Sequence, residues 1–82
     1  MLEVALTRLD PDVAVPTYAR PGDAGLDLQS RIDVTIARAG GRRLVPTALA
    51  VALPVGYPGF VLPRSGIALR HGVTCLNTPG LL

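Results

Sequence analysis

Glycine and proline recur along this chain so often that they leave room only for short structural elements. Nine glycines and eight prolines stand among the 82 residues. Both destabilise the interior of a helix and favour turns. Between them, aliphatic residues alternate with polar or small ones, as Leu2, Val4 and Leu6 do. Because a period of two is typical of half-buried strands, the sequence predicts an all-β fold.

The pattern predicts a single domain over residues 1–82, with six or seven short strands and one brief helix near residues 65–71. In the longest alternating run, large Leu49, Val51 and Leu53 take turns with alanines. This arrangement indicates a strand packed on both faces, as in a sandwich or barrel. The expected strands span residues 2–9, 24–30, 32–37, 42–54, 61–63 and 72–77, with turns at 22–23, 38–43 and 56–60.

The size and charge of the chain limit the classes of function that it can have. A domain this small buries only about 60% of the surface of its unfolded chain, so partner subunits or further sequence are expected to complete the core. The net charge is +2, from eight scattered arginines and six acids. Tyr18, Tyr57 and Phe60 are the only aromatic residues. Because a nucleic-acid surface usually combines a dense basic stripe with stacking aromatics, we expect no nucleic-acid partner.

Compartment is predicted from cysteine usage and apolar runs. Cys75 is the single cysteine, so no internal disulfide can form, and its apolar neighbours indicate a buried small hydrophobe. The N-terminus lacks the basic start of a signal peptide. The longest apolar run, residues 44–56, contains two prolines and is too short to span a bilayer. We therefore expect a cytoplasmic protein that does not enter the membrane.

The stretch "LPRSGIALRHGV", residues 62–73, carries the first candidate site. Ser65 is a good N-cap residue, and Gly66 allows a ligand to approach the backbone closely. Ala68 stands where a capping box would need Glu or Gln, so the first amides of the helix stay available. With Arg64 beside them, these amides favour an anion, above all phosphate.

Blander interpretations of this stretch remain open. Ser65 could serve only as a helix cap, and Arg64 could be a solvated surface charge. A nucleophilic serine is disfavoured because the pattern is not GxSxG. His71 stands at the end of the same short helix, where a positive charge is favourable, rather than in the place of a general base.

Two further stretches carry polar groups. In "RPGDAGLDLQS", Gly22 and Asp23 form a turn, and Asp27 points away from its leucine neighbours. An outward carboxylate is either solvated or, beside bound phosphates, able to support Mg²⁺. In "CLNTPGLL", the amide of Asn77 can donate and accept at once, as recognition of a base edge requires. Pro79 and Gly80 indicate a turn that opens a hairpin.

The order and spacing of these stretches carry more information than each one alone. "DAGLDL", "PRSGIALRHGV" and "LNTPG" resemble the first, second and opening third motifs of the trimeric dUTP diphosphatase (dUTPase) family. The resemblance covers essentially the whole chain, and its second motif is the most specific.

The resemblance implies a distorted jelly-roll β-barrel, assembled as a homotrimer with active sites at subunit interfaces. It also implies Mg²⁺-dependent hydrolysis of dUTP to dUMP and pyrophosphate. Motif matching assigns Arg64, Ser65 and Gly66 to the phosphates, Asn77, Gly80 and Leu81 to uracil and deoxyribose, and Asp27 to support of the metal and phosphate region.

The chain departs from the family pattern at its end. The third motif continues in the family as Gly-x-Ile-Asp-x-x-Tyr, and here Leu82 takes the Ile place. The resemblance therefore puts the catalytic aspartate just beyond Leu82, and no residue of this chain is assigned as catalytic. We expect an incomplete barrel, the N-terminal part of a dUTPase-type enzyme, with little or no activity by itself.

Three rival functions remain. A non-catalytic relative would bind deoxynucleotides without turnover. The second rival is the sibling dCTP deaminase, which shares the fold that the resemblance implies. The quoted motifs match the diphosphatase better, and deaminase chemistry would need a glutamate beyond Leu82. A small structural β-domain would bind no ligand, and its Arg64→Ala variant would be indistinguishable from the parent.

Overall fold

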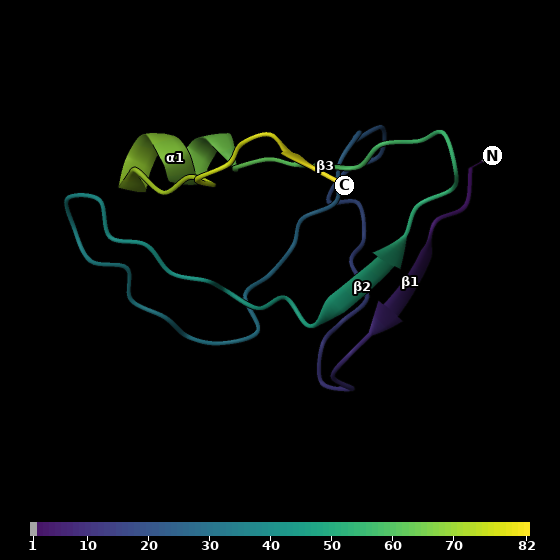
Figure 1. Cartoon of the computed structure of the whole chain (residues 1–82), viewed down its shortest axis with the longest axis horizontal. Helices are drawn as coiled ribbons and strands as arrows, with labels where there is room; N and C mark the ends of the chain where they lie inside the picture. The colour runs from purple at the N-terminus through teal and green to yellow at the C-terminus, as the bar shows by residue number, and fades with distance from the viewer. Residues whose placement is uncertain (1) are drawn as a thin grey trace. The chain divides into compact units, whose positions relative to one another are not determined.

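Residues 2–82 form four short strands and one short helix (Figure 1). A computed structural model describes residues 2–82, and its contacts divide the chain into two units. One unit is Ala5–Val51, and the other is Ala52–Leu82 with the first residues of the chain. In chain order, the elements are β1 (Ala5–Arg8), β2 (Leu49–Ala52), β3 (Phe60–Val61), α1 (Ser65–His71) and β4 (Gly80–Leu81).

The unit Ala5–Val51 is organised around β1, which pairs with β2. The two strands point in opposite directions in Figure 1. Beyond β1, the N–H of Leu9 donates to the carbonyl of Ala48 at 2.8 Å. The strand predicted at residues 42–54 shortens to β2 because Ala48 has a φ of 55°, a left-handed conformation that interrupts an extended strand.

The strands predicted at residues 24–30 and 32–37 do not form. Arg31 donates its N–H to the carbonyl of Pro46 at 2.8 Å, but no ladder develops along these residues. Aliphatic alternation marks a segment able to join a sheet, and the strand itself requires a hydrogen-bonded neighbour. The prediction of six or seven strands was wrong for the described residues, which form four.

Glycine positions predicted two turns correctly. Gly22 has a φ of 84°, and the N–H of Asp23 donates to the carbonyl of Arg20 at 3.2 Å. The turn predicted at residues 38–43 is present, with Gly40 at a φ of 90°. The third turn, predicted at 56–60, comes earlier: the N–H of Tyr57 donates to the carbonyl of Pro54 at 3.2 Å.

In the second unit, β3 and β4 form an antiparallel ladder. Phe60 stands opposite Leu81, and Val61 stands opposite Gly80. The N–H of Leu82 donates to the carbonyl of Gly59 at 2.8 Å, and the reverse bond is 3.3 Å long. The strand predicted at residues 72–77 was wrong, because this stretch leaves the helix and turns, with the N–H of Thr78 donating to the carbonyl of Cys75 at 3.2 Å.

Helix α1 occupies the predicted residues, Ser65–His71, and ends at a glycine. Gly72 has a φ of 65°, and its N–H donates to the carbonyl of Ala68 at 3.0 Å. His71 lies in the last turn beside Arg70, as expected for a charge at a helix C-terminus. No helix within residues 2–82 has the length and apolar character needed to cross a membrane.

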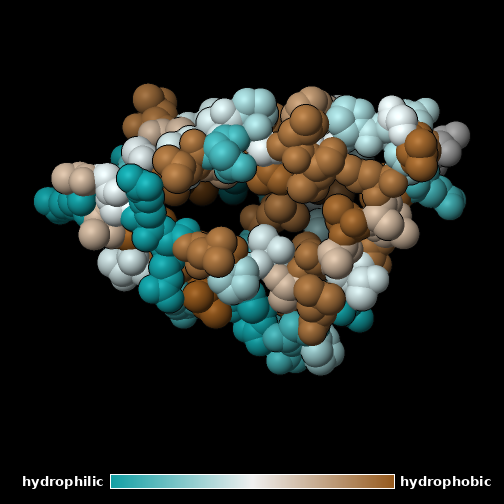
Figure 2. Space-filling view, in the orientation of Figure 1, coloured by the Kyte–Doolittle hydropathy of each residue, from teal (hydrophilic) through white to brown (hydrophobic). Residues whose placement is uncertain are grey.

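The described residues bury no hydrophobic side chain completely. The chain exposes 7252 Å², whereas a compact monomer of its 8.5 kDa exposes about 4,700 Å². Apolar residues lie over much of the visible surface (Figure 2). Val51 in β2 is 45% exposed, and Cys75 is only partly buried, so neither is the fully packed residue that the sequence predicted. Residues 2–82 form no closed barrel.

Candidate functional site

The junction between β3 and α1 carries the proposed phosphate segment. Arg64 precedes the helix in an extended conformation, with φ −85° and ψ 130°, and its carbonyl accepts the N–H of Ala68 at 2.9 Å. Arg64 is therefore the N-cap, and Ser65 is the first helical residue. The prediction of Ser65 as N-cap was wrong by one position, and no side chain forms a capping hydrogen bond.

The second candidate segment runs into β4. Gly80 is buried, and a β-carbon there would lie 3.4 Å from Cβ of Val61 and 3.5 Å from Nδ2 of Asn77. These are ordinary van der Waals distances, so the Asn77 amide lies next to Gly80 at the start of β4. Gly80 and Leu81 are strand residues, and the predicted turn lies just before them, at 76–79.

The β3–β4 register brings these two segments to one end of the same ladder. Val61 stands opposite Gly80. Arg64 follows Val61 by three residues, and Asn77 precedes Gly80 by three. Because paired strands run antiparallel, both segments leave the ladder at the same end. The register therefore places the Arg64 and Asn77 segments at the same end of the ladder, in which Gly80 and Leu81 themselves are paired.

Asp27, the seventh predicted residue, lies in the unit Ala5–Val51. It lines a hollow of about 280 Å³ within that unit. Gln29 lines the same hollow and was missed by sequence reasoning, although its spacing of two from Asp27 places both on one side of an extended segment. The other lining residues are Val13, Ala14, Val15, Pro16, Thr17, Ala19, Thr47 and Leu49.

Asp23, the other acid of the first motif, has a structural role. Its carboxylate Oδ2 accepts the backbone N–H of Arg20 at 2.9 Å, while its own N–H donates to the carbonyl of Arg20. These two bonds close the turn that contains Gly22. Asp23 is therefore held in the turn that precedes the Asp27 segment.

Charge is distributed unequally along the chain. Residues 52–82 contain Arg64, Arg70 and His71 but no aspartate or glutamate. Helix α1 accordingly has no acid in its first turn. This part of the chain is suited to an anionic ligand, because it holds cationic side chains and no carboxylate that would repel one.

The described residues do not build a metal cage of their own. No three His, Cys, Asp or Glu side chains gather within residues 2–82. Mg²⁺, however, commonly binds through one or two carboxylates together with waters and substrate phosphates. A single carboxylate is therefore compatible with an ion that arrives with a phosphate ligand.

Together, the paired strands and the acid-free helix junction define a β-rich chain with one segment suited to an anionic ligand. The chain belongs to the dUTPase family, whose family model matches residues 12–81.

Relatives of known name extend this result. A deoxyuridine 5'-triphosphate nucleotidohydrolase from Streptomyces coelicolor is 52% identical over 81 residues, covering 99% of this chain and 44% of the relative. The enzyme of the same name from Rhodococcus erythropolis is 56% identical over 79 residues, covering 96% of this chain and 48% of the relative. The enzyme of this name from Dictyoglomus turgidum is 48% identical over 85 residues, covering 100% of this chain and 58% of the relative. The chain thus spans about half the length of the curated relatives it matches.

Proposed function

We propose that this chain is the N-terminal part of an enzyme that hydrolyses dUTP to dUMP and pyrophosphate. The observation that carries the proposal is the family match, which spans all three motif segments and both sides of the β3–β4 ladder. Relatives about 50% identical bear the name deoxyuridine 5'-triphosphate nucleotidohydrolase. The rival deaminase function receives no support from these names.

In this proposal the helix junction binds the triphosphate. The guanidinium of Arg64 supplies charge-assisted hydrogen bonds to phosphate oxygens, and Ser65 and Gly66 contribute the first-turn backbone amides. No capping side chain competes for those amides. The absence of acids in residues 52–82 favours the same ligand.

The segment before β4 recognises the base. The Asn77 amide offers one donor and one acceptor to the uracil edge, while Gly80 and Leu81 contribute backbone groups beside it. The Asn77 amide lies next to Gly80, within van der Waals reach of the position a β-carbon would take there. Mg²⁺ would bind the phosphates, and Asp27 would support it through water or a neighbouring arginine.

Hydrolysis requires a general base that these segments do not contain. Residues 52–82 carry no aspartate or glutamate, Asp23 is engaged in its turn, and Asp27 is assigned to support of the metal. Loss of a general base lowers the rate by about 10²–10⁴. The chain by itself is therefore proposed to bind nucleotide with little or no turnover. We further propose that the complete enzyme is a cytoplasmic homotrimer with a jelly-roll barrel.

The direct test is binding of a hydrolysis-resistant dUTP analogue to the 82-residue chain by calorimetry, with Mg²⁺ present. We expect the analogue to bind more tightly than the corresponding dCTP analogue, and Arg64→Ala to weaken binding at least tenfold, since charge-assisted hydrogen bonds contribute about 1.5–3 kcal/mol. Equal affinity for both analogues, or an unaffected Arg64→Ala variant, would contradict the proposal.

Turnover separates the enzyme fragment from its rivals. We expect pyrophosphate release from dUTP to stay at the level of the buffer alone. Release of ammonia from dCTP would instead identify a deaminase, and absence of any nucleotide binding would leave a structural domain.

A further inference from the structure

Three separate segments of the unit Ala5–Val51 form the walls of the hollow that Asp27 lines. The first wall starts at Val13, and the third starts at Thr47. The second wall carries Asp27 and Gln29. Within residues 2–82, this second wall belongs to no strand ladder. Its position therefore depends on contacts other than strand pairing.

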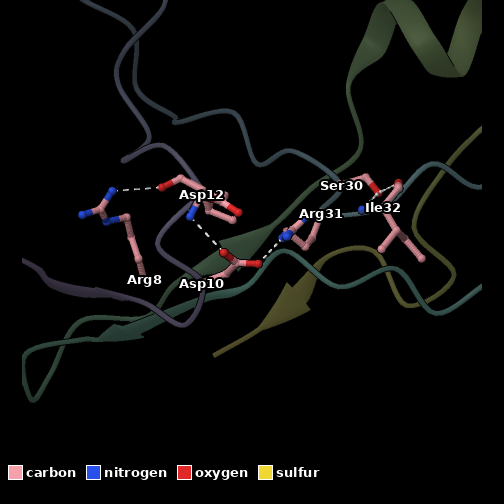
Figure 3. A network of polar contacts seen from close by, with 7 residues as sticks. Arg8, Asp10, Asp12, Ser30, Arg31 and Ile32 are labelled. Atoms are coloured by element: carbon pink, nitrogen blue, oxygen red, sulfur yellow. Dashed lines mark hydrogen bonds and ion pairs between the residues drawn. The ribbon is translucent and has the colours of Figure 1, made fainter.

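Arg31, two residues beyond Gln29, supplies a contact to the first wall. Its guanidinium donates from Nε to the carboxylate oxygen Oδ2 of Asp10, and the two side chains form an ion pair (Figure 3). Asp10 also closes the turn before the first wall, because its carbonyl accepts the N–H of Val13 at 3.2 Å. The side chain of Arg31 thus ties the second wall to the first.

The backbone of Arg31 ties the second wall to the third. Its N–H donates to the carbonyl of Pro46 at 2.8 Å, directly before Thr47. The chain is also fixed on both sides of Arg31, since the N–H of Ile32 donates to Oγ of Ser30 at 3.2 Å. One residue therefore connects all three walls, through its side chain to the first and through its backbone to the third.

We propose that Arg31 is a positioning residue, which holds the three walls together and so keeps Asp27 at the hollow. This inference rests on the proposed function, in which Asp27 supports Mg²⁺ bound to the phosphates. The side chains of Arg31 and Asp10 are 40% and 26% exposed, so water and salt weaken their attraction. The ion pair is therefore expected to adjust the position of Asp27 by modest factors and not to decide whether the unit folds.

Hydrogen exchange tests the connection itself. The 82-residue chain is compared with its Arg31→Met variant, which keeps an unbranched apolar stem and removes the ion pair. We expect the protection of the amide at position 31 to fall about two- to fivefold, as for the loss of an exposed ion pair. The amide of Asp23 donates to Arg20 and lies outside the hollow, so its protection should not change. Unchanged protection at position 31 would overturn the proposal.

The dependence of affinity on Mg²⁺ tests the positioning role. The hydrolysis-resistant dUTP analogue is titrated with and without Mg²⁺, and the gain in affinity from Mg²⁺ is compared between the two chains. We expect Arg31→Met to reduce this gain about two- to fivefold. Affinity without Mg²⁺ should stay unchanged, because Asp27 acts through the ion. A residue that only supports the fold would lower both affinities by the same factor, and this outcome would overturn the positioning role.

Matched variants show whether the ion pair is responsible. Arg38 is another exposed arginine of the same unit, so Arg38→Met removes the same charge and should keep the full gain from Mg²⁺. Arg31→Lys keeps a cation near Asp10 and should restore part of the gain. Asp10→Asn should reduce the gain as Arg31→Met does, and the two substitutions together should cost no more than either one. Strictly additive losses would overturn the role of the pair.

The possible failures are distinguishable. If the parent gains affinity from Mg²⁺ and Arg31→Met gains as much, the role of Arg31 is overturned and the proposed function stands. If the parent binds the analogue equally with and without Mg²⁺, metal support by Asp27 is overturned, and the positioning role with it. If the parent does not bind the analogue at all, the proposed function and the inference are both overturned.

Discussion

At the scale of single residues, the best-defined polar cluster surrounds Asp10 at the end of β1 (Figure 3). Oδ1 of Asp10 accepts the backbone N–H of Asp12 at 2.9 Å, and Oδ2 accepts the guanidinium N–H of Arg31. Arg8 adds a bond from Nη1 to the carbonyl of Val13 at 3.2 Å. The cluster ties the turn after β1 to a segment twenty-one residues further along.

These contacts predict an acid-sensitive turn. The Asp12 amide, and after it the Arg31 guanidinium, lower the pKa of the Asp10 carboxyl from its ordinary 3.8. A lowered folded-state pKa gives stabilisation that is fully present above the unfolded-state value and is lost as the pH falls through the folded-state value. We therefore expect the Asp12 amide to lose protection from hydrogen exchange below about pH 3.8.

The variants of this prediction are Asp10→Asn and Asp33→Asn. Asp10→Asn should remove the acid dependence of the Asp12 amide, while Asp33→Asn, at an exposed position outside the cluster, should preserve it. Because the side chains of Arg31 and Asp10 are 40% and 26% exposed, the effect on the whole chain should be small. An Asp12 amide that exchanges at the same rate in Asp10→Asn and in the parent would contradict this account.

Residue identity indicated the candidate residues but could not give their exact geometry. Arg64, Ser65 and Gly66 were recognised as a unit, but which residue caps the helix depends on where the backbone leaves its extended conformation, and Arg64 does so. The proximity of Gly66 to Arg70 follows from helical spacing once α1 is known. Sequence reasoning misses this proximity because Arg70 is one of several arginines scattered along the chain.

At the scale of elements, the end of α1 depends on one backbone conformation. Gly72 has a φ of 65°, and its N–H caps the helix at Ala68. Non-glycine residues pay about 1–2 kcal/mol for this left-handed conformation. We expect Gly72→Ala to destabilise α1 by about 1 kcal/mol, measured as lost helical circular dichroism during urea titration.

Gly25 provides the matched control for this prediction. Its φ is not positive, and a β-carbon there meets no atom within 4 Å. Gly25→Ala should therefore leave the helical signal unchanged. A Gly72→Ala variant with the parent's urea profile would show that the left-handed cap does not limit helix stability.

The strands show where local pattern stops being sufficient. Residues 2–9 alternate and form β1 because β2 is available as a neighbour. Residues 24–30 and 32–37 alternate equally well but have no ladder partner among residues 2–82. Helix α1, whose hydrogen bonds are all local, was predicted close to its observed bounds. A sequence of this kind therefore predicts helices and turns directly, and strands only where their partners are also present.

At the scale of the whole molecule, apolar surface dominates. Twenty large hydrophobic residues are exposed, among them Leu44 at 93% and Val55 at 101%. Burial of apolar surface is the main favourable term in folding, at about 25 cal/mol per Å². Because the described residues leave much of their apolar surface exposed, they gain little of this stabilisation. Their stability should therefore depend on whatever covers that surface.

This exposure predicts how the 82-residue chain behaves by itself. We expect it to bind the dye ANS strongly and to self-associate at micromolar concentrations, because exposed apolar surface and the unpaired edges of β3 and β4 favour association. Light scattering after size exclusion should show mass rising with concentration. A monomer that excludes ANS and unfolds cooperatively would mean that these 82 residues bury a core of their own. The strands predicted at 24–30 and 32–37 would then have found partners.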